Sequence, residues 1–253
     1  MPWMAAYGKE QLLTRESPER RQQMKTMQRT SLPVFFMTMG LLTVFSLTVF
    51  AQDKVHKNKW MFDKEKVGAV PNGWRTDETN GRGKPGKWEV VKNNSAPTLP
   101  NVIALTQTKN TGGTFNLLIA EKTRFKDVEI KVKVKAMAGK EDQGGGPIWR
   151  AKDENNYYVA RWNPLESNFR VYYVKNGSRK QIAGVRANLD SKDWHEIKIR
   201  HVGAMITATL NDKKVIEVTD NTFKEAGMIG LWTKADAAAA FDEVEVEEVK
   251  AGE

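Results

Sequence analysis

Apolar and charged residues alternate strictly along residues 127–136, and this alternation limits the possible folds more than any other feature of the chain. Val128, Ile130, Val132 and Val134 occupy every second position, with Glu or Lys between them. A period of two places the two sets of side chains on opposite faces of a β-strand. The segment is therefore predicted to be a strand with one buried and one solvated face, as is typical of antiparallel sheets.

The rest of the chain after residue 60 repeats this pattern in short segments. Ile197 and Ile199 alternate with charged residues, and turn-forming pairs such as Asn176-Gly177 separate the segments. We expect about a dozen short strands and no long helix, which favours an all-β, concanavalin A-like two-sheet jelly-roll sandwich. The chain has no cysteine, which excludes disulfides and thiol catalysis, and a domain of about 200 residues can bury enough core without them.

The N-terminal part carries a different signal. Residues 32–51 form an uncharged apolar segment ending in Ala51, the layout of an export signal cleaved after that residue. A retained membrane anchor is the alternative, since about 20 apolar residues can span a bilayer. Lys54, Lys57 and Lys59 on the far side favour cleavage. The expected division is an extension with signal peptide over 1–51, a linker over 52–59, the domain over 60–249 and a tail over 250–253.

This division predicts a periplasmic or extracellular protein with no membrane span in the mature chain. Six of the 40 Lys and Arg and three of the 31 Asp and Glu precede residue 52, so the net charge falls from +9 to +6. The charges are spread singly along the segments, so no nucleic-acid partner is expected. No Asp cluster has the spacing of calcium ligands, so no metal or other cofactor is predicted, although calcium can support this fold class.

The segments between residues 143 and 183 have two chemically different faces. Turns at 152–155, 164–167 and Asn176-Gly177 set the strand pairing, and alternation then assigns one face to large apolar residues and the other to polar and aromatic ones. The pairing places Arg161 opposite Arg170 and Arg150 opposite Tyr157. The second face, here called the front face, is expected to hold Gly146, Arg150, Tyr157, Arg161, Asn163, Asn168, Arg170, Tyr172 and Gln181.

Two interpretations of the front face remain open. Guanidinium groups and amides can bind hydroxyls or carboxylates while tyrosine rings stack on sugars, with Gly146 leaving a gap beside Arg161. Alternatively, the arginines of a solvated face pair with Glu166 or with loop carboxylates such as Asp153.

Several motifs resemble a known family. They are Asp142-Gln143-Gly144-Gly145-Gly146, Asp153-Glu154-Asn155-Asn156-Tyr157-Tyr158 and Leu231-Trp232-Thr233-Lys234-Ala235-Asp236. Together they resemble the LamG-like, concanavalin A-like lectin and glucanase domains, and more narrowly the 3-keto-disaccharide hydrolase-like domains. The resemblance covers residues 60–249 and implies a jelly roll with a concave sugar-binding face. It carries over no catalytic residue.

The candidate site residues follow from the front face and its loops. The predicted ligand-binding residues are Gln143, Arg150, Tyr157, Arg161, Asn163, Asn168, Arg170, Tyr172 and Lys234. Glu166 and Asp236 are the candidates for acid or base catalysis. Glu243, Glu245 and Glu247, which are similar in spacing to a laminarinase strand, are interpreted as an exposed strand face. His195 is interpreted as a core residue.

The sequence thus predicts an exported protein that hydrolyses or binds saccharides at the front face. A non-catalytic carbohydrate-binding module is one alternative. An envelope protein that uses the same face for a protein partner is another.

Overall fold

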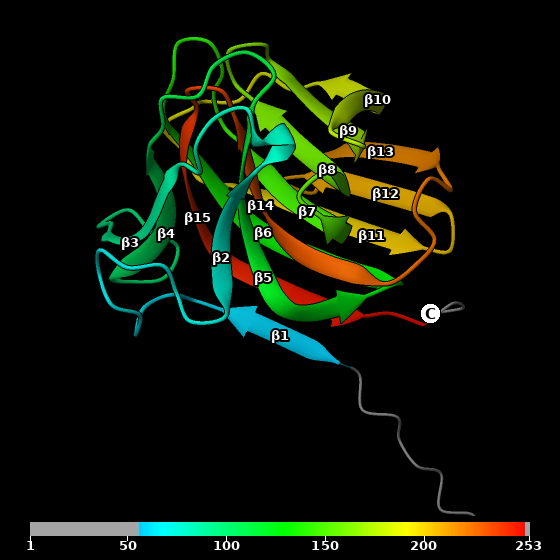
Figure 1. The fold of residues 1–253 in the computed structure, drawn as a ribbon, viewed down its shortest axis with the longest axis horizontal. Coiled ribbons are helices and arrows are strands. Elements are labelled where there is room, and N and C mark those ends of the chain that lie inside the picture. The colour runs from blue at the N-terminus through cyan, green and yellow to red at the C-terminus, as the bar shows by residue number, and fades with distance from the viewer. Residues whose placement is uncertain (1–55, 251–253) are drawn as a thin grey trace, which may run out of the picture. The chain divides into compact units, whose positions relative to one another are not determined.

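The computed structural model describes residues 56–250, except the side chains of Lys214 and Val215. These residues form fifteen strands and one short 3-10 helix, η1 (Thr79–Gly81). All strand pairs are antiparallel, and they build two sheets (Figure 1). The predicted all-β, two-sheet jelly-roll sandwich is confirmed. The predicted signal peptide and the end of the predicted tail lie outside the described residues.

One sheet has seven strands and carries the front face. In spatial order it consists of β10 (Ser178–Arg186), β9 (Asn168–Lys175), β8 (Asn156–Asn163), β7 (Gly146–Asp153), β14 (Gly227–Lys234), β5 (Phe115–Phe125) and β2 (Trp74–Glu78). Three consecutive hairpins therefore make up the half of this sheet that runs from β7 to β10.

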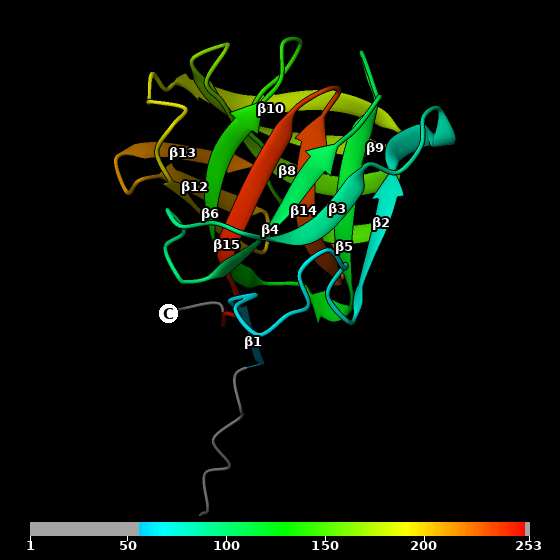
Figure 2. The same ribbon diagram turned by 90° about the vertical axis from the view of Figure 1, so that its left-hand side faces the viewer.

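The other sheet has eight strands. In spatial order they are β13 (Lys214–Thr219), β12 (Met205–Leu210), β11 (His195–Val202), β6 (Val128–Ala138), β15 (Ala238–Glu248), β4 (Asn101–Gln107) and β3 (Lys87–Lys92), with β1 (Lys57–Trp60) paired to β15. In Figure 2, β15 is drawn in red and runs between β6 and β4. Strand β1 begins within the predicted linker, and Lys57 pairs with Glu247.

The core lies between the two sheets, where their inward side chains meet. The alternation in β6 is realised as predicted, because Val128, Ile130, Val132 and Val134 are at most 1 % exposed. From the seven-stranded sheet, Trp149, Trp162 and Phe169 pack against them in the same cluster. Burying each such large side chain contributes on the order of 1.5–3 kcal/mol.

The glycine run 144–146 lets the start of β7 approach its neighbours closely. A Cβ on Gly144 would collide with the carbonyl oxygen of Trp162, one on Gly145 with that of Trp232, and one on Gly146 with that of Ala160. The gap predicted beside Arg161 is therefore wrong, since Gly146 is needed for tight backbone packing. No helix within residues 56–250 is long and apolar enough to cross a membrane.

Candidate functional site

The pairing of β8, β9 and β10 follows the registers predicted from their turns. The two-residue turn Asn176-Gly177 joins β9 to β10, and a four-residue turn over 164–167 joins β8 to β9. The confirmed pairs are Arg161 with Arg170, Asn163 with Asn168, Tyr172 with Gln181, Tyr173 with Lys180, and Lys175 with Ser178.

The hairpin of β7 and β8 differs from its prediction at Arg150. Trp149 pairs with Tyr158, and the next pair is Asp153 with Asn156, so a bulge lies between them. Arg150 sits in this bulge with φ 45°, and the pairing predicted between Arg150 and Tyr157 is wrong. Its guanidinium donates to the backbone oxygens of Lys126, Gly203 and Phe223 and to the carboxylate of Asp127. Arg150 therefore ties loops together instead of facing the other front-face residues.

Four aromatic side chains, here called the aromatic floor, line the middle of the front face: Phe115, Tyr157, Tyr172 and Trp232. Each is at most 4 % exposed. The Tyr157 hydroxyl lies 2.8 Å from the Thr79 hydroxyl of η1 and accepts a hydrogen bond of 3.1 Å from Trp232 Nε1. Burial raises the pKa of Tyr157. Tyr157 and Tyr172, both predicted to contact ligand, thus form a supporting layer.

Arg179 of β10 covers this floor. Its guanidinium carbon lies 4.5 Å from the ring centroid of Tyr172, 5.2 Å from that of Phe115 and 5.8 Å from that of Trp232, which are cation–π distances. Sequence reasoning did not select Arg179. The Asn176-Gly177 turn nevertheless places it opposite Val174 and two residues from Gln181, which assigns it to the front face.

A group of seven polar residues, here called the polar cluster, lies at the end of the face near the 164–167 turn: Asp142, Arg161, Asn163, Glu166, Asn168, Arg170 and Lys234. Asp142 is its centre. Its carboxylate accepts hydrogen bonds from Arg161 Nη2 at 2.9 and 3.1 Å and from Asn163 Nδ2 at 3.1 Å, and it lies 3.1 Å from Lys234 Nζ. Asp142 and Arg161 are each 1 % exposed.

Glu166 is the second carboxylate of the cluster and its most exposed charge. Its Oε1 lies 3.4 Å from Arg161 Nη2, and its Oε2 lies 3.2 Å from Arg170 Nη1 and 2.8 Å from Asn168 Nδ2. Arg161 Nη2 therefore contacts two carboxylates. The front face thus has two carboxylates on one guanidinium group, one buried and one largely exposed.

The environments of the two carboxylates move their pKa values in opposite directions. Burial raises the pKa of Asp142 and outweighs the charges of Arg161 and Lys234. Partial burial also acts to raise the pKa of Glu166, but the hydrogen bond from Asn168 and the charges of Arg161 and Arg170 outweigh it and lower that pKa. Such divergence between neighbouring groups is typical of acid and base pairs in active sites.

The other predicted residues have supporting roles. Asn163 links Asp142 to the turn, because its Oδ1 accepts a hydrogen bond of 3.2 Å from the Glu166 backbone N–H. Gln143 donates to the Gly139 carbonyl at 2.9 Å. Asp236 accepts hydrogen bonds from the backbone N–H groups of residues 140–142 at 2.6 to 3.1 Å. Asp236 therefore fixes the loop that presents Asp142, and it does not join the two carboxylates at Arg161.

A hollow opens beside the exposed side of the polar cluster. Its lining residues are Leu165, Glu166, Ser167, Asn168, Arg170, Gln181, Gly184, Val185 and Arg186. Glu166 and Arg170 border this hollow, whereas Asp142 and Arg161 are not among its lining residues.

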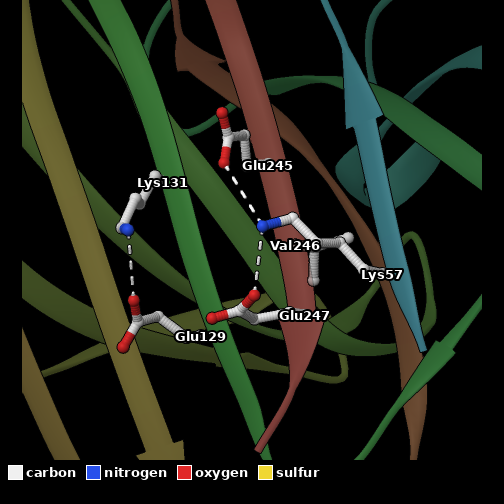
Figure 3. A pocket seen from close by; sticks show the side chains of 6 residues that line it. All are labelled: Lys57, Glu129, Lys131, Glu245, Val246 and Glu247. Atoms are coloured by element: carbon white, nitrogen blue, oxygen red, sulfur yellow. Dashed lines mark hydrogen bonds and ion pairs between the residues drawn. The ribbon is translucent and has the colours of Figure 1, made fainter. Parts of the chain in front are cut away.

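The acidic run of β15 belongs to a different surface. Figure 3 shows Lys57 of β1 between Glu245 and Glu247, whose carboxylates lie 3.8 and 3.2 Å from its ammonium group. Val244 and Val246 point into the core, so these glutamates lie on the outer face of the eight-stranded sheet. They balance basic neighbours, as predicted.

The two strand histidines are core residues. His195 is 4 % exposed, and its ring nitrogens contact the Asp190 carbonyl at 2.7 Å and Asn211 Nδ2 at 2.9 Å. His201 Nδ1 accepts a hydrogen bond of 2.9 Å from Trp149 Nε1. Within residues 56–250, no group of three or more His, Asp or Glu is placed to hold a metal ion.

Comparison with family models gives one match. The model of the 3-keto-alpha-glucoside-1,2-lyase-like domain matches residues 58–247, most of the chain. The chain belongs to the 3-keto-alpha-glucoside-1,2-lyase-like domain family. The match confirms the family resemblance seen in the sequence motifs. Comparison with curated proteins gives no match.

Solved structures similar to this lyase-like domain show the same fold. The carbohydrate-binding module CBM66 from Bacillus subtilis has a TM-score of 0.55 at 20 % identity, over 68 % of this chain and 94 % of that one. The mannose- and Ca²⁺-bound exoplasmic/lumenal domain of VIP36 has a TM-score of 0.52 at 14 % identity, over 78 % and 93 %. The GH43 protein BlXynB from Bacillus licheniformis has a TM-score of 0.51 at 14 % identity, over 76 % of this chain and 39 % of that one.

Proposed function

We propose that this domain binds saccharides at the front face and cleaves 3-keto-α-glucosides by elimination across C1 and C2. The observation that carries the proposal is the pair of carboxylates, Asp142 and Glu166, held on one guanidinium nitrogen of Arg161. The family's name supplies the substrate class and the reaction class. The predicted hydrolysis of a disaccharide is replaced here by elimination.

The chemistry requires a base for one carbon-bound proton. A ketone at C3 acidifies the hydrogen on C2, and a base removes it, leaving its electron pair as an enolate. That pair then forms the C1–C2 double bond as the C1–O bond breaks and the departing alkoxide takes up a proton. The products are an alcohol and an unsaturated 3-keto sugar, so no water is consumed in this step.

Glu166 is the proposed base. A glutamate is ordinarily ionised at neutral pH, and the pKa of Glu166 is lowered because Asn168 and the neighbouring cations outweigh partial burial. It also borders the hollow that admits a ligand. General base catalysis by a positioned carboxylate typically contributes about 10²–10⁴ in rate.

The cations beside Glu166 are the proposed stabilisers of the enolate and the leaving oxygen. Arg170 borders the same hollow, and the side chain of Lys234 retains 17 % exposure while its ammonium contacts Asp142. Fixed donors aimed at developing negative charge are a large source of catalysis. Asp142 and Arg161 are assigned positioning roles because they are buried.

Saccharide binding without turnover is the second candidate. It is favoured by the same burial, since Asp142 and Arg161 are each 1 % exposed and leave few groups to act on a substrate.

In both cases we propose that the protein acts outside the cytoplasm, with residues 1–51 directing export. Mass spectrometry of the secreted protein tests this, and a mature chain beginning at Gln52 is the expected result.

The deciding experiment compares methyl 3-keto-α-glucoside with methyl α-glucoside. Formation of a conjugated enone, followed by its ultraviolet absorbance, is expected only from the keto sugar. Binding of either sugar with no enone and no methanol release would support the second candidate. Release of methanol with recovery of an intact 3-keto sugar and no enone, even transiently, would contradict elimination.

A further inference from the structure

We propose that Arg179 is an anion-recognition residue, and that the preferred ligand of the front face carries a carboxylate. The inference rests on the proposed saccharide binding and adds an acidic substituent to the ligand. The carboxylate of a uronic acid unit has the chemistry that this arginine fits.

The partners of Arg179 distinguish it from the other front-face cations. Arg161, Arg170 and Lys234 each contact Asp142 or Glu166 within 3.4 Å. Arg179 is half-buried, makes no ion pair among the described residues, and its Nη1 has no hydrogen-bond partner. A guanidinium group removed from water without such partners is costly, and a bound anion would offset that cost.

The charge balance of the front face points the same way. Four cations, Arg161, Arg170, Arg179 and Lys234, face two carboxylates, those of Asp142 and Glu166. The charges of Arg161 and Asp142 both act on Arg179, whose pKa burial lowers. The group therefore retains an excess of positive charge even when both carboxylates are ionised, which favours an anionic ligand.

The aromatic floor holds the guanidinium in a defined position. Tyr172 lies beneath it at 4.5 Å, with Phe115 and Trp232 on the same layer. A planar guanidinium fixed in this way has a forked donor geometry that matches the two oxygens of a carboxylate. Arg179 also follows the Asn176-Gly177 turn, where Asn80 Nδ2 donates to the Gly177 carbonyl at 2.9 Å and braces the hairpin.

Two sugars that differ only at C6 test the proposal. Methyl α-glucopyranoside has a hydroxymethyl group there, and methyl α-glucopyranosiduronate has a carboxylate. Titration calorimetry of the full chain at neutral pH and low salt measures the affinity for each sugar. The affinity for the uronate is expected to be about tenfold higher or more, as a charge-assisted bidentate contact implies. In Arg179→Gln the two affinities are expected to become equal.

Two variants complete the test. Lys180→Gln removes one charge from the residue next to Arg179 in β10. The Lys180 side chain points to the opposite face of the sheet, so the preference for the uronate should be retained. Arg179→Lys keeps the charge but loses the fork, and the preference should fall severalfold. In wild-type protein, the Nε–H resonance of Arg179 should shift on addition of the uronate, a measurement that needs no variant.

The outcomes separate this inference from the proposed function. If both sugars bind equally, or if Arg179→Gln retains the preference, Arg179 only seals the aromatic floor and the inference is overturned while saccharide binding stands. If neither sugar binds the wild-type protein, the inference fails, while the proposed function is judged separately by binding and turnover of methyl 3-keto-α-glucoside.

Discussion

Arg161 and Arg170 lie directly opposite each other across β8 and β9 and share a single carboxylate, that of Glu166. Like charges in directly opposed positions destabilise a sheet pair. Glu166 reaches both guanidinium groups from the turn that joins the two strands, and Asp142 holds Arg161 from behind. The like-charge pair is thus compensated locally, and the same compensation produces two carboxylates with different environments.

Replacing Glu166 with Gln should separate catalysis from stability. Enone formation from the keto sugar is expected to fall by about 10²–10⁴. The free energy of unfolding should change by no more than about 1 kcal/mol, because the side chain is 44 % exposed and its contacts are screened by water. Glu245→Gln, which removes a carboxylate from the outer face shown in Figure 3, is the matched control and should retain full turnover. Turnover within a few-fold of wild type in Glu166→Gln would exclude Glu166 as the base.

Replacing Asp142 with Asn should be costly for folding. The change leaves the buried guanidinium of Arg161 without its main counter-charge, and breaking such a pair typically costs about 3–5 kcal/mol. The double variant Asp142→Leu with Arg161→Met removes both charges and is expected to recover much of that loss. Urea denaturation of Asp142→Asn and of the double variant measures this recovery. A loss below about 1 kcal/mol in Asp142→Asn would show that the buried pair contributes little.

The glycine run at the start of β7 should tolerate no side chain. Gly146→Ala would drive a methyl group into the Ala160 carbonyl oxygen, which is backbone and cannot turn aside. A loss of about 1–3 kcal/mol in the free energy of unfolding is expected. Gly113→Ala is the control, since a Cβ there has no neighbour within 4 Å, and its stability should stay near wild type.

Stability should fall in acid through His201. Burial, with the nearby charge of Arg150, lowers the pKa of His201 from 6.5 to about 3. The folded state thus keeps this ring neutral, while the unfolded state takes up a proton below pH about 6.5. The contribution of the neutral ring to the free energy of unfolding is therefore complete above that pH and is lost progressively as the pH falls toward 3. The loss is about 5 kcal/mol at most.

Urea denaturation at several pH values checks the contribution of His201. The difference in unfolding free energy between wild type and His201→Gln should shrink as the pH falls from 6.5 toward 3. A difference that is constant with pH would mean that His201 does not control this dependence.

Much of the sheet could be predicted because its signals are local. A two-residue Asn-Gly turn fixes the pairing on both sides of it, and alternation then assigns faces. The same reasoning brought Arg161 opposite Arg170. Arg179 was not among the predicted front-face residues, and only the structure shows that this side chain lies over three aromatic rings.

The misses have non-local causes. The bulge at Arg150 depends on carbonyl groups from three distant loops, which no turn motif reveals. Tyr157 is buried partly because Thr79, far away in sequence, reaches its hydroxyl. The central place of Asp142 depends on Asp236 holding its loop, so its importance appears only when both segments are seen together.

The close passage of β7 between β8 and β14 has a consequence for how this fold can diversify. Residues 144–146 have no room for a Cβ because carbonyl oxygens of both neighbouring strands occupy that space. Asp142 stands only two positions upstream, so any relative that exchanges these glycines must redirect the chain and move the carboxylate with it. Substitutions in the solvent-facing 164–167 turn can therefore change the front face without moving the backbone. The position of the Asp142 carboxylate, in contrast, is fixed by the backbone course of residues 144–146.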